Sequence, residues 1–233
     1  MIMRTILCVL LLFVGLGAKE VYAVFNVEAL EDANLTLDSS GIVDAIYVDV
    51  GGKVKKGDIL LTLYNKDKKS QVDSITQQYN FMQKQYERYK KIGGAIDKNT
   101  LDKYYADYKK LEFDRNYALA VVEKTILKAP FDGVIASKNI ELGEGMNANN
   151  TLLFRLVSKK LKMVLEFDSR YIHEVKVGDS FFYSVDGGGN NFKAVITKIY
   201  PTIDVKTRKV SAEALLPAQS NLRPGIFGDG FIK

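Results

Sequence analysis

The feature that most constrains the fold is an internal repeat interrupted by a segment of different periodicity. At a constant offset of 92 residues the chain aligns with itself, placing Gly41 on Gly133, Val48 on Ile140, Val50 on Leu142, Gly51 on Gly143, Val54 on Met146, Gly57 on Asn149 and Leu60 on Leu152. Asparagine fits opposite Gly57, because it is the commonest non-glycine residue to adopt a left-handed turn. A repeat at fixed offset indicates one supersecondary unit built twice.

Apolar residues alternate with polar ones inside the repeat, which is typical of half-buried β-strands. In the first copy they are Ile46, Val48 and Val50, then Ile59, Leu61 and Leu63. Neither copy is large enough to bury a core alone. We therefore expect a small β-sandwich that closes only when the two distant copies face each other. Sharp turns are expected at Gly41, Gly51, Gly57, Gly133, Gly143 and Asn149.

The insert between the copies, residues 66–123, has the periodicity of a coiled coil. Spacings of three and four connect Val72, Ile75, Tyr79, Met82, Tyr86 and Tyr89, and then Leu101, Tyr104, Tyr108, Leu111, Arg115, Ala118 and Val122. Two helices of about 26 residues would extend about 39 Å. Between them, two glycines end the first helix and Asp97 is a natural N-cap for the second. We expect ordinary packing of the seam tyrosines, while Arg115 reaches water or pairs with a carboxylate.

Strand patterns return in residues 160–233, where short apolar runs are separated by turn residues. The runs are "LKMVLEF", "DSFFYSV", "FKAVITKIYP", "KVSAEALLP" and "GIFGDGFIK", and a further turn is expected at Gly225. Strands at this spacing indicate a small antiparallel β-barrel.

The N-terminus has the pattern of a secretory signal peptide. Arg4 precedes the apolar run Ile6–Leu16, and "VYA" ends in a small residue, so we expect cleavage after Ala23. The run of eleven residues is shorter than the roughly 20 needed to span a bilayer, although retention as an anchor is an alternative. Cys8, the only cysteine, lies inside the leader, so we expect a mature chain without disulfides.

The residues that catalysis or metal binding would need are sparse. His173 is the only histidine, and the methionines are far apart in sequence, so neither an enzyme nor a metal site is expected. The net charge of +5 is spread without a polybasic tract, so no nucleic-acid partner is expected. No cofactor is expected either. In a lipoyl or biotinyl carrier the modified lysine would fall on Asp67, between Lys66 and Lys68, where the insert replaces the required tight hairpin.

The order of repeat half, helical hairpin, repeat half and barrel resembles the periplasmic adaptors, or membrane fusion proteins of the hemolysin D type, of resistance-nodulation-division efflux pumps. The strings "KAPFDGVI" at 128–135, "IYPTIDVKTR" at 199–208 and "LRPGIF" at 222–227 strengthen the resemblance. The fold class it implies is mainly β: a split lipoyl-like β-sandwich with an inserted α-helical coiled-coil hairpin, followed by a small antiparallel β-barrel.

The expected domain organisation is a signal peptide at 1–23, an N-terminal strand and first lipoyl-like half at 24–65, the hairpin at 66–123, the second half at 124–159 and the barrel at 160–233. The family's membrane-proximal domain is expected to be absent or vestigial.

The resemblance implies a non-enzymatic protein of the Gram-negative periplasm that links an inner-membrane transporter to a TolC-type outer-membrane channel and self-associates into a trimeric or hexameric ring. The exported compounds would be drugs or other toxic compounds, as in antibiotic resistance. By the family's pattern the hairpin tip contacts the channel, and in this chain the tip comprises Arg88, Ile92, Gly93, Gly94, Ala95, Ile96 and Asp97. Arg88 matches the family's arginine, Ile92 stands where the family has leucine, and Asp97 departs from the family's serine. Alternatives are an adaptor of an ATP-driven exporter, a lipoyl or biotinyl carrier, and a periplasmic holdase.

Overall fold

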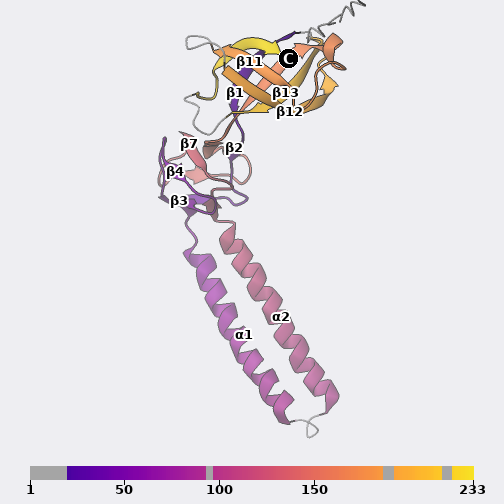
Figure 1. Cartoon of the computed structure of the whole chain (residues 1–233). Coiled ribbons are helices and arrows are strands. Elements are labelled where there is room, and N and C mark those ends of the chain that lie inside the picture. Colours follow the sequence, from indigo (N-terminus) through magenta and orange to yellow (C-terminus); the bar gives the residue numbers. More distant parts are fainter. Residues whose placement is uncertain (1–19, 93–96, 186–191, 217–221) are drawn as a thin grey trace, which may run out of the picture. The chain divides into compact units, whose positions relative to one another are not determined.

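The computed structural model describes residues 20–92, 97–185, 192–216 and 222–233 (Figure 1). The chain divides into two compact units. One comprises Ala29–Lys160, and the other comprises the residues up to Glu28 together with Leu161–Lys233.

The unit Ala29–Lys160 contains two four-stranded sheets and the hairpin. One sheet has the order β2-β9-β7-β4 and the other β6-β5-β3-β8. The strands are β2 (Asp32–Leu35), β3 (Gly41–Ile46), β4 (Lys53–Val54), β5 (Ile59–Leu63), β6 (Ile126–Lys128), β7 (Gly133–Lys138), β8 (Gly145–Met146) and β9 (Phe154–Ser158). Leu60, Leu61, Leu153, Phe154 and Leu156 are each 0% exposed in the core between them.

The two halves of the repeat exchange their short strands. β4, from the first half, pairs with β7, with Val54 opposite Gly133. β8, from the second half, pairs with β3, with Met146 opposite Gly41. These two pairings are equivalent under the offset of the repeat, so each half completes the sheet of the other. The fold class expected from the sequence is therefore confirmed for this module.

Two of the expected turn residues lie in strands instead. The backbone φ is positive at Gly51, Gly57, Gly143, Gly225 and Asn149. Gly41 and Gly133, in contrast, are the first residues of β3 and β7. At Gly133 the reason for glycine is space, because a Cβ would overlap the carbonyl oxygen of Val157 and approach Leu156 Cδ1 to 2.9 Å.

The second unit is a closed six-stranded barrel with the order β1-β10-β13-β12-β11-β14. Its elements are β1 (Val21–Ala29), β10 (Leu161–Asp168), the short 3₁₀ helix η2 (Ser169–Tyr171), β11 (Ser180–Val185), β12 (Phe192–Ile203), β13 (Lys209–Leu215) and β14 (Phe227–Ile232). Phe25, Phe181 and Tyr183 pack edge to face or stacked at its centre, with ring centroids 5.2–5.7 Å apart. Closure removes the exposed strand edges that an open sheet would present.

The barrel includes a strand that the sequence analysis grouped elsewhere. Residues from 24 onward were expected to accompany the first lipoyl-like half, and residues up to Ala23 to be part of the leader. In the structure β1 pairs with β14 from Val21 opposite Ile232 to Asn26 opposite Phe227. Val21 and Ala23 are 2% and 0% exposed. β1 belongs to the barrel because its side chains alternate between the barrel core and the surface. It is one of the six strands that close the barrel.

We predict that processing of the leader leaves β1 intact, so that the mature chain begins before Val21. Cleavage after Ala23 would remove three of the six recorded β1–β14 pairs and two core side chains. Burial of one aliphatic side chain such as Val21 contributes about 2 kcal/mol, so the loss would weaken the barrel. N-terminal sequencing of the processed protein purified from its source cells checks this, and a mature N-terminus at Val24 would contradict it.

Candidate functional site

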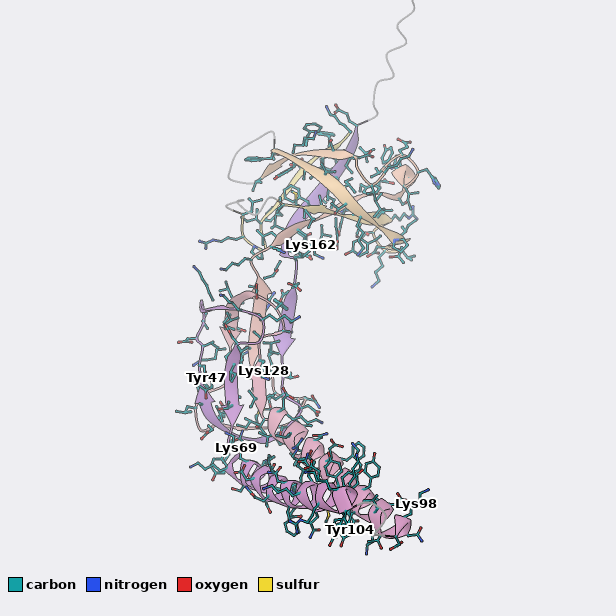
Figure 2. The ribbon with its side chains drawn as sticks, turned by 60° about the horizontal axis from the view of Figure 1, so that its bottom comes forward. Tyr47, Lys69, Lys98, Tyr104, Lys128 and Lys162 are labelled. Atoms are coloured by element: carbon teal, nitrogen blue, oxygen red, sulfur yellow. The ribbon has the colours of Figure 1, made fainter. Side chains whose placement is uncertain are left out.

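The helical hairpin extends from the two-sheet sandwich of the unit Ala29–Lys160, between strands β5 and β6 (Figures 1 and 2). It consists of α1 (Lys66–Ile92) and α2 (Lys98–Glu123), of 27 and 26 residues. Its base is fixed by two buried polar residues, since Asn65 Nδ2 donates to Thr125 Oγ1 (2.8 Å) and Thr125 Oγ1 donates to Val122 O (2.6 Å). Leu63 N also donates to Thr125 O (2.9 Å). The two ends of the hairpin therefore leave from one hydrogen-bonded point of the sandwich.

Tyrosines from both helices stack along the seam that the spacing predicted. Tyr89 lies on Tyr104 with ring centroids 4.4 Å apart, and Tyr86 lies on Tyr108 at 5.8 Å with the rings nearly parallel. The hydroxyls of Tyr79 and Tyr108 are 3.4 Å apart. That hydrogen bond, followed by burial, raises the pKa of Tyr108. The seam tyrosines thus pack their rings against each other, while the hydroxyls of Tyr79 and Tyr108 form a hydrogen bond. Both are expected of aromatic residues with a polar tip.

Arg115 occupies the seam position that its spacing predicted, but it makes a contact that the sequence analysis did not anticipate. Its guanidinium lies 4.1 Å from the centroid of the Tyr79 ring. No carboxylate of the described residues lies within 4.0 Å of it, and its buried Nε has no hydrogen-bond partner among them. The recorded contact of the cation is with the face of an aromatic ring, an arrangement that contributes about 0.5–2 kcal/mol depending on its desolvation.

The outer surface of the hairpin exposes aromatic side chains away from the seam. Phe81, Phe113 and Tyr117 are 62%, 67% and 74% exposed. Phe113 and Tyr117 are four residues apart on α2, so they lie on one face of that helix. The sequence analysis overlooked them because it followed only the seam. The signal that could have revealed them is a pair of aromatic residues at helical spacing outside the heptad positions a and d.

The expected tip residues lie at the far ends of the helices, as far as they are described. Arg88 is exposed in the last turns of α1, and Ile92, the last residue of α1, is 50% exposed. Asp97 caps α2, because its carboxylate accepts hydrogen bonds from the hydroxyl and the backbone N–H of Thr100, and these bonds lower the pKa of Asp97. Gly93, Gly94, Ala95 and Ile96 lie outside the described residues.

The lysines that a carrier domain would modify lie in a helix. Lys66 is the first residue of α1, and Lys68 Nζ is 3.8 Å from the carboxylate of Asp67. No tight turn is present there to present a swinging arm. The lysines at this position are therefore helix residues and are not placed on a tight turn, where a carrier domain has its modified lysine.

Two negative findings concern only the described part of the chain. Among those residues, no group of three or more His, Cys, Asp or Glu side chains is arranged to hold a metal ion. In the same residues, no helix is both long and apolar enough to cross a bilayer.

A family of known domains matches the β-module and the hairpin. Residues 32–157, more than half of the chain, match the CzcB-like barrel-sandwich hybrid domain. Over 210 residues the chain is 24% identical to the cobalt-zinc-cadmium resistance protein CzcB of Cupriavidus metallidurans, a match that covers 81% of this chain and 40% of that protein. The chain spans between 40% and 64% of the length of the curated relatives it matches.

Solved structures share the fold at low sequence identity. A chimera of MacA and MexA that contains the α-hairpin domain of Pseudomonas aeruginosa MexA superposes with a TM-score of 0.80 at 22% identity, over 93% of this chain and 82% of the chimera. The membrane fusion protein Spr0693 of Streptococcus pneumoniae R6 superposes with a TM-score of 0.74 at 14% identity, over 91% of this chain and 98% of that one. The hairpin, the split sandwich and the barrel thus occur together in other proteins.

Proposed function

The chain belongs to the membrane fusion proteins with a CzcB-like barrel-sandwich hybrid domain, and from this membership we propose that it is the adaptor of an efflux system. In this role it acts in the periplasm without catalysing a reaction. It links an inner-membrane transporter of the resistance-nodulation-division type to a TolC-type outer-membrane channel, and so supports export of drugs or other toxic compounds.

The observation that carries the proposal is a long hairpin rooted in a rigid module. Helices of 27 and 26 residues correspond to about 40 Å of reach at 1.5 Å per residue. The buried Asn65–Thr125 hydrogen bond and the sandwich core fix the direction in which the hairpin leaves. An arm of this length can contact a partner far from the sandwich, whereas a core element or a catalytic loop needs no such reach.

The exposed groups of the hairpin suit protein contacts. Arg88 and Ile92 are exposed towards the end of α1, where we propose that the outer-membrane channel binds. Phe113 and Tyr117 provide an apolar face on α2 for a neighbouring copy of the chain in a trimeric or hexameric ring. Aromatic residues are enriched at such interfaces.

Cross-linking in the source cells followed by affinity purification tests the proposal. We expect the tagged protein to recover an inner-membrane transporter and an outer-membrane channel, both identified by mass spectrometry. A transporter with an ATPase subunit would assign the protein to the ATP-driven exporters instead. Recovery of only unfolded client proteins, or an added lipoyl or biotinyl mass on Lys66 or Lys68, would contradict the adaptor function.

A further inference from the structure

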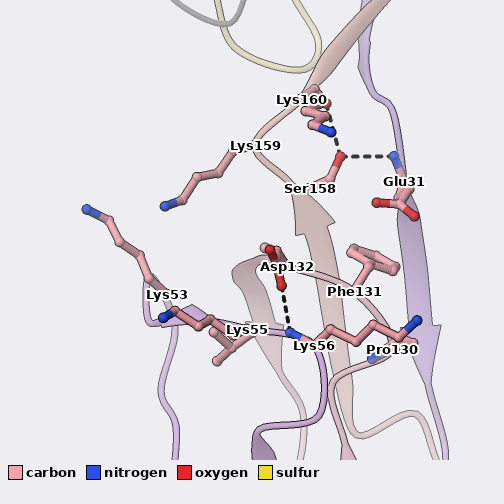
Figure 3. A pocket seen from close by; sticks show the side chains of 12 residues that line it. Glu31, Lys53, Lys55, Lys56, Pro130, Phe131, Asp132, Ser158, Lys159 and Lys160 are labelled. Carbon is pink, nitrogen blue, oxygen red and sulfur yellow. Dashed lines mark hydrogen bonds between the residues drawn. The ribbon is translucent and has the colours of Figure 1, made fainter.

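A pocket lined by lysines opens on the unit Ala29–Lys160, where β7 begins and β9 ends (Figure 3). Its volume is about 710 Å³. Five lysines line it: Lys53, Lys55 and Lys56 from β4 and the residues after it, and Lys159 and Lys160 from the segment after β9. Only two carboxylates, of Glu31 and Asp132, line it as well. The fold thus gathers like charges from segments about a hundred residues apart.

Several lysines of the same unit are paired with carboxylates, whereas in the described part of the chain these five are not. Lys68, Lys124, Lys128 and Lys138 each have a carboxylate oxygen within 4.0 Å. No such pair within the described residues involves any of the five pocket lysines, all of which are exposed. A concave surface lined mainly by one sign of charge, here five lysines against two carboxylates, attracts ions of the opposite sign.

The framework beneath the lysines is held by hydrogen bonds. Lys56 N donates to Asp132 Oδ1 (2.7 Å), which ties the segment after β4 to the segment before β7. Ser158, 5% exposed, accepts from Glu31 N and donates to Lys160 O, both at 3.0 Å. In Figure 3 these bonds fix the backbone from which the lysine side chains extend. The lysine backbone positions are therefore set by the folded module, while their ammonium groups stay adjustable.

From this arrangement we propose that the lysine pocket is a docking site for an acidic segment of a partner protein, one that carries several Asp or Glu residues. Lysine ammoniums on flexible stems act as point charges and do not select the geometry of one anion. Two fixed polar groups of the lining residues, the Ser158 hydroxyl and the Lys56 N–H, already have partners within the chain. A site for one small molecule would need free groups of that kind to orient it.

The apolar lining of the pocket argues against a lipid surface as the occupant. Membrane-surface sites place exposed aromatic or aliphatic side chains beside their basic residues. Here Val54 is buried and Phe131 is only partly exposed. Both belong to, or pack against, the core of the sandwich, so neither is an exposed apolar side chain that could insert into a lipid surface. An extended acidic peptide instead uses what the pocket supplies, which is several adjustable cations above a partly apolar floor.

The test uses an octaglutamate peptide and the full chain, with binding measured by calorimetry at low ionic strength. The triple variant K53Q/K159Q/K160Q is expected to bind about tenfold more weakly, because it loses three exposed charge pairs that are each weak but act together. The matched control K84Q/K103Q/K110Q removes the same charge from exposed positions of the hairpin. We expect its affinity for the peptide to stay within about twofold of that of the wild-type protein. Added salt should weaken binding to the unchanged protein.

Three results would overturn the proposal. The first is no measurable binding of octaglutamate to the unchanged protein at low salt. The second is an equal loss of affinity in the two triple variants, which would indicate attraction by net charge alone. The third is that inorganic triphosphate or phosphatidylglycerol vesicles bind more tightly than the peptide and depend more strongly on Lys53, Lys159 and Lys160. Circular dichroism of all variants confirms that each chain is folded.

Discussion

Replacing Lys66–Glu123 by a Gly-Asn-Gly linker is expected to abolish the proposed binding to an outer-membrane channel while the sandwich and the barrel stay folded. The cut ends lie close together, because Leu63 N donates to Thr125 O and Asn65 Nδ2 donates to Thr125 Oγ1. A short turn can therefore join them, as in a simple hairpin between β5 and β6, which are already paired. Within the helices α1 and α2, the buried residues are Tyr79 and Ala118, and both lie in the seam between these helices.

Three measurements follow from this variant. Circular dichroism should lose the helical signal of both helices and keep the strand signal. Cross-linking to the channel and export should both fall to background. The finer variant Arg88→Glu should weaken channel capture about tenfold or less, as loss of a single exposed cation would, and leave the hairpin folded. Full export by the hairpin-less chain would show that the helices are not the link to the channel.

Much of this architecture could be predicted because its determinants are local or periodic. Heptad spacing defined the seam in which Tyr86 stacks on Tyr108, and the repeat offset anticipated that Val54 and Met146 would take equivalent places in the two sheets. Hydrophobic period and glycine spacing report on backbone conformation within a few residues. The fold class therefore followed from the sequence.

The parts that could not be predicted depend on contacts between distant segments. No local sequence pattern identifies β1 as a strand of the barrel, because the strands with which it pairs, β14 and β10, lie far along the chain. For the same reason, neither Lys53 nor Lys159 has a local pattern that places it in a shared pocket. Arg115 could be recognised as unusual, but its contact with the ring of Tyr79 depends on the crossing of two helices.

Gly133→Ala is expected to destabilise the sandwich by about 3 kcal/mol, the upper end of the usual cost of overpacking. The new Cβ would overlap the backbone carbonyl oxygen of Val157 on the paired strand β9, and it would lie 2.9 Å from Leu156 Cδ1. A side chain could rotate away from such an overlap, whereas a carbonyl in a strand ladder moves only with its strand. β7 and β9 are neighbours inside their sheet, so we expect the pairing of both strands to weaken.

Hydrogen exchange measured by mass spectrometry separates this effect from general destabilisation, because it reports the opening of each segment. Exchange should accelerate about a hundredfold in peptides that cover β7 and β9, which is the factor that about 3 kcal/mol corresponds to, and should change little in the barrel strands β11 and β14, which belong to the other unit. Gly145→Ala is the matched control, since its φ is not positive and a Cβ there meets nothing within 4 Å. That variant should be neutral or slightly stabilising, because alanine restricts the unfolded chain more than glycine does. Equal acceleration in the two variants would mean that loss of glycine flexibility, and not the space between β7 and β9, accounts for the requirement at position 133.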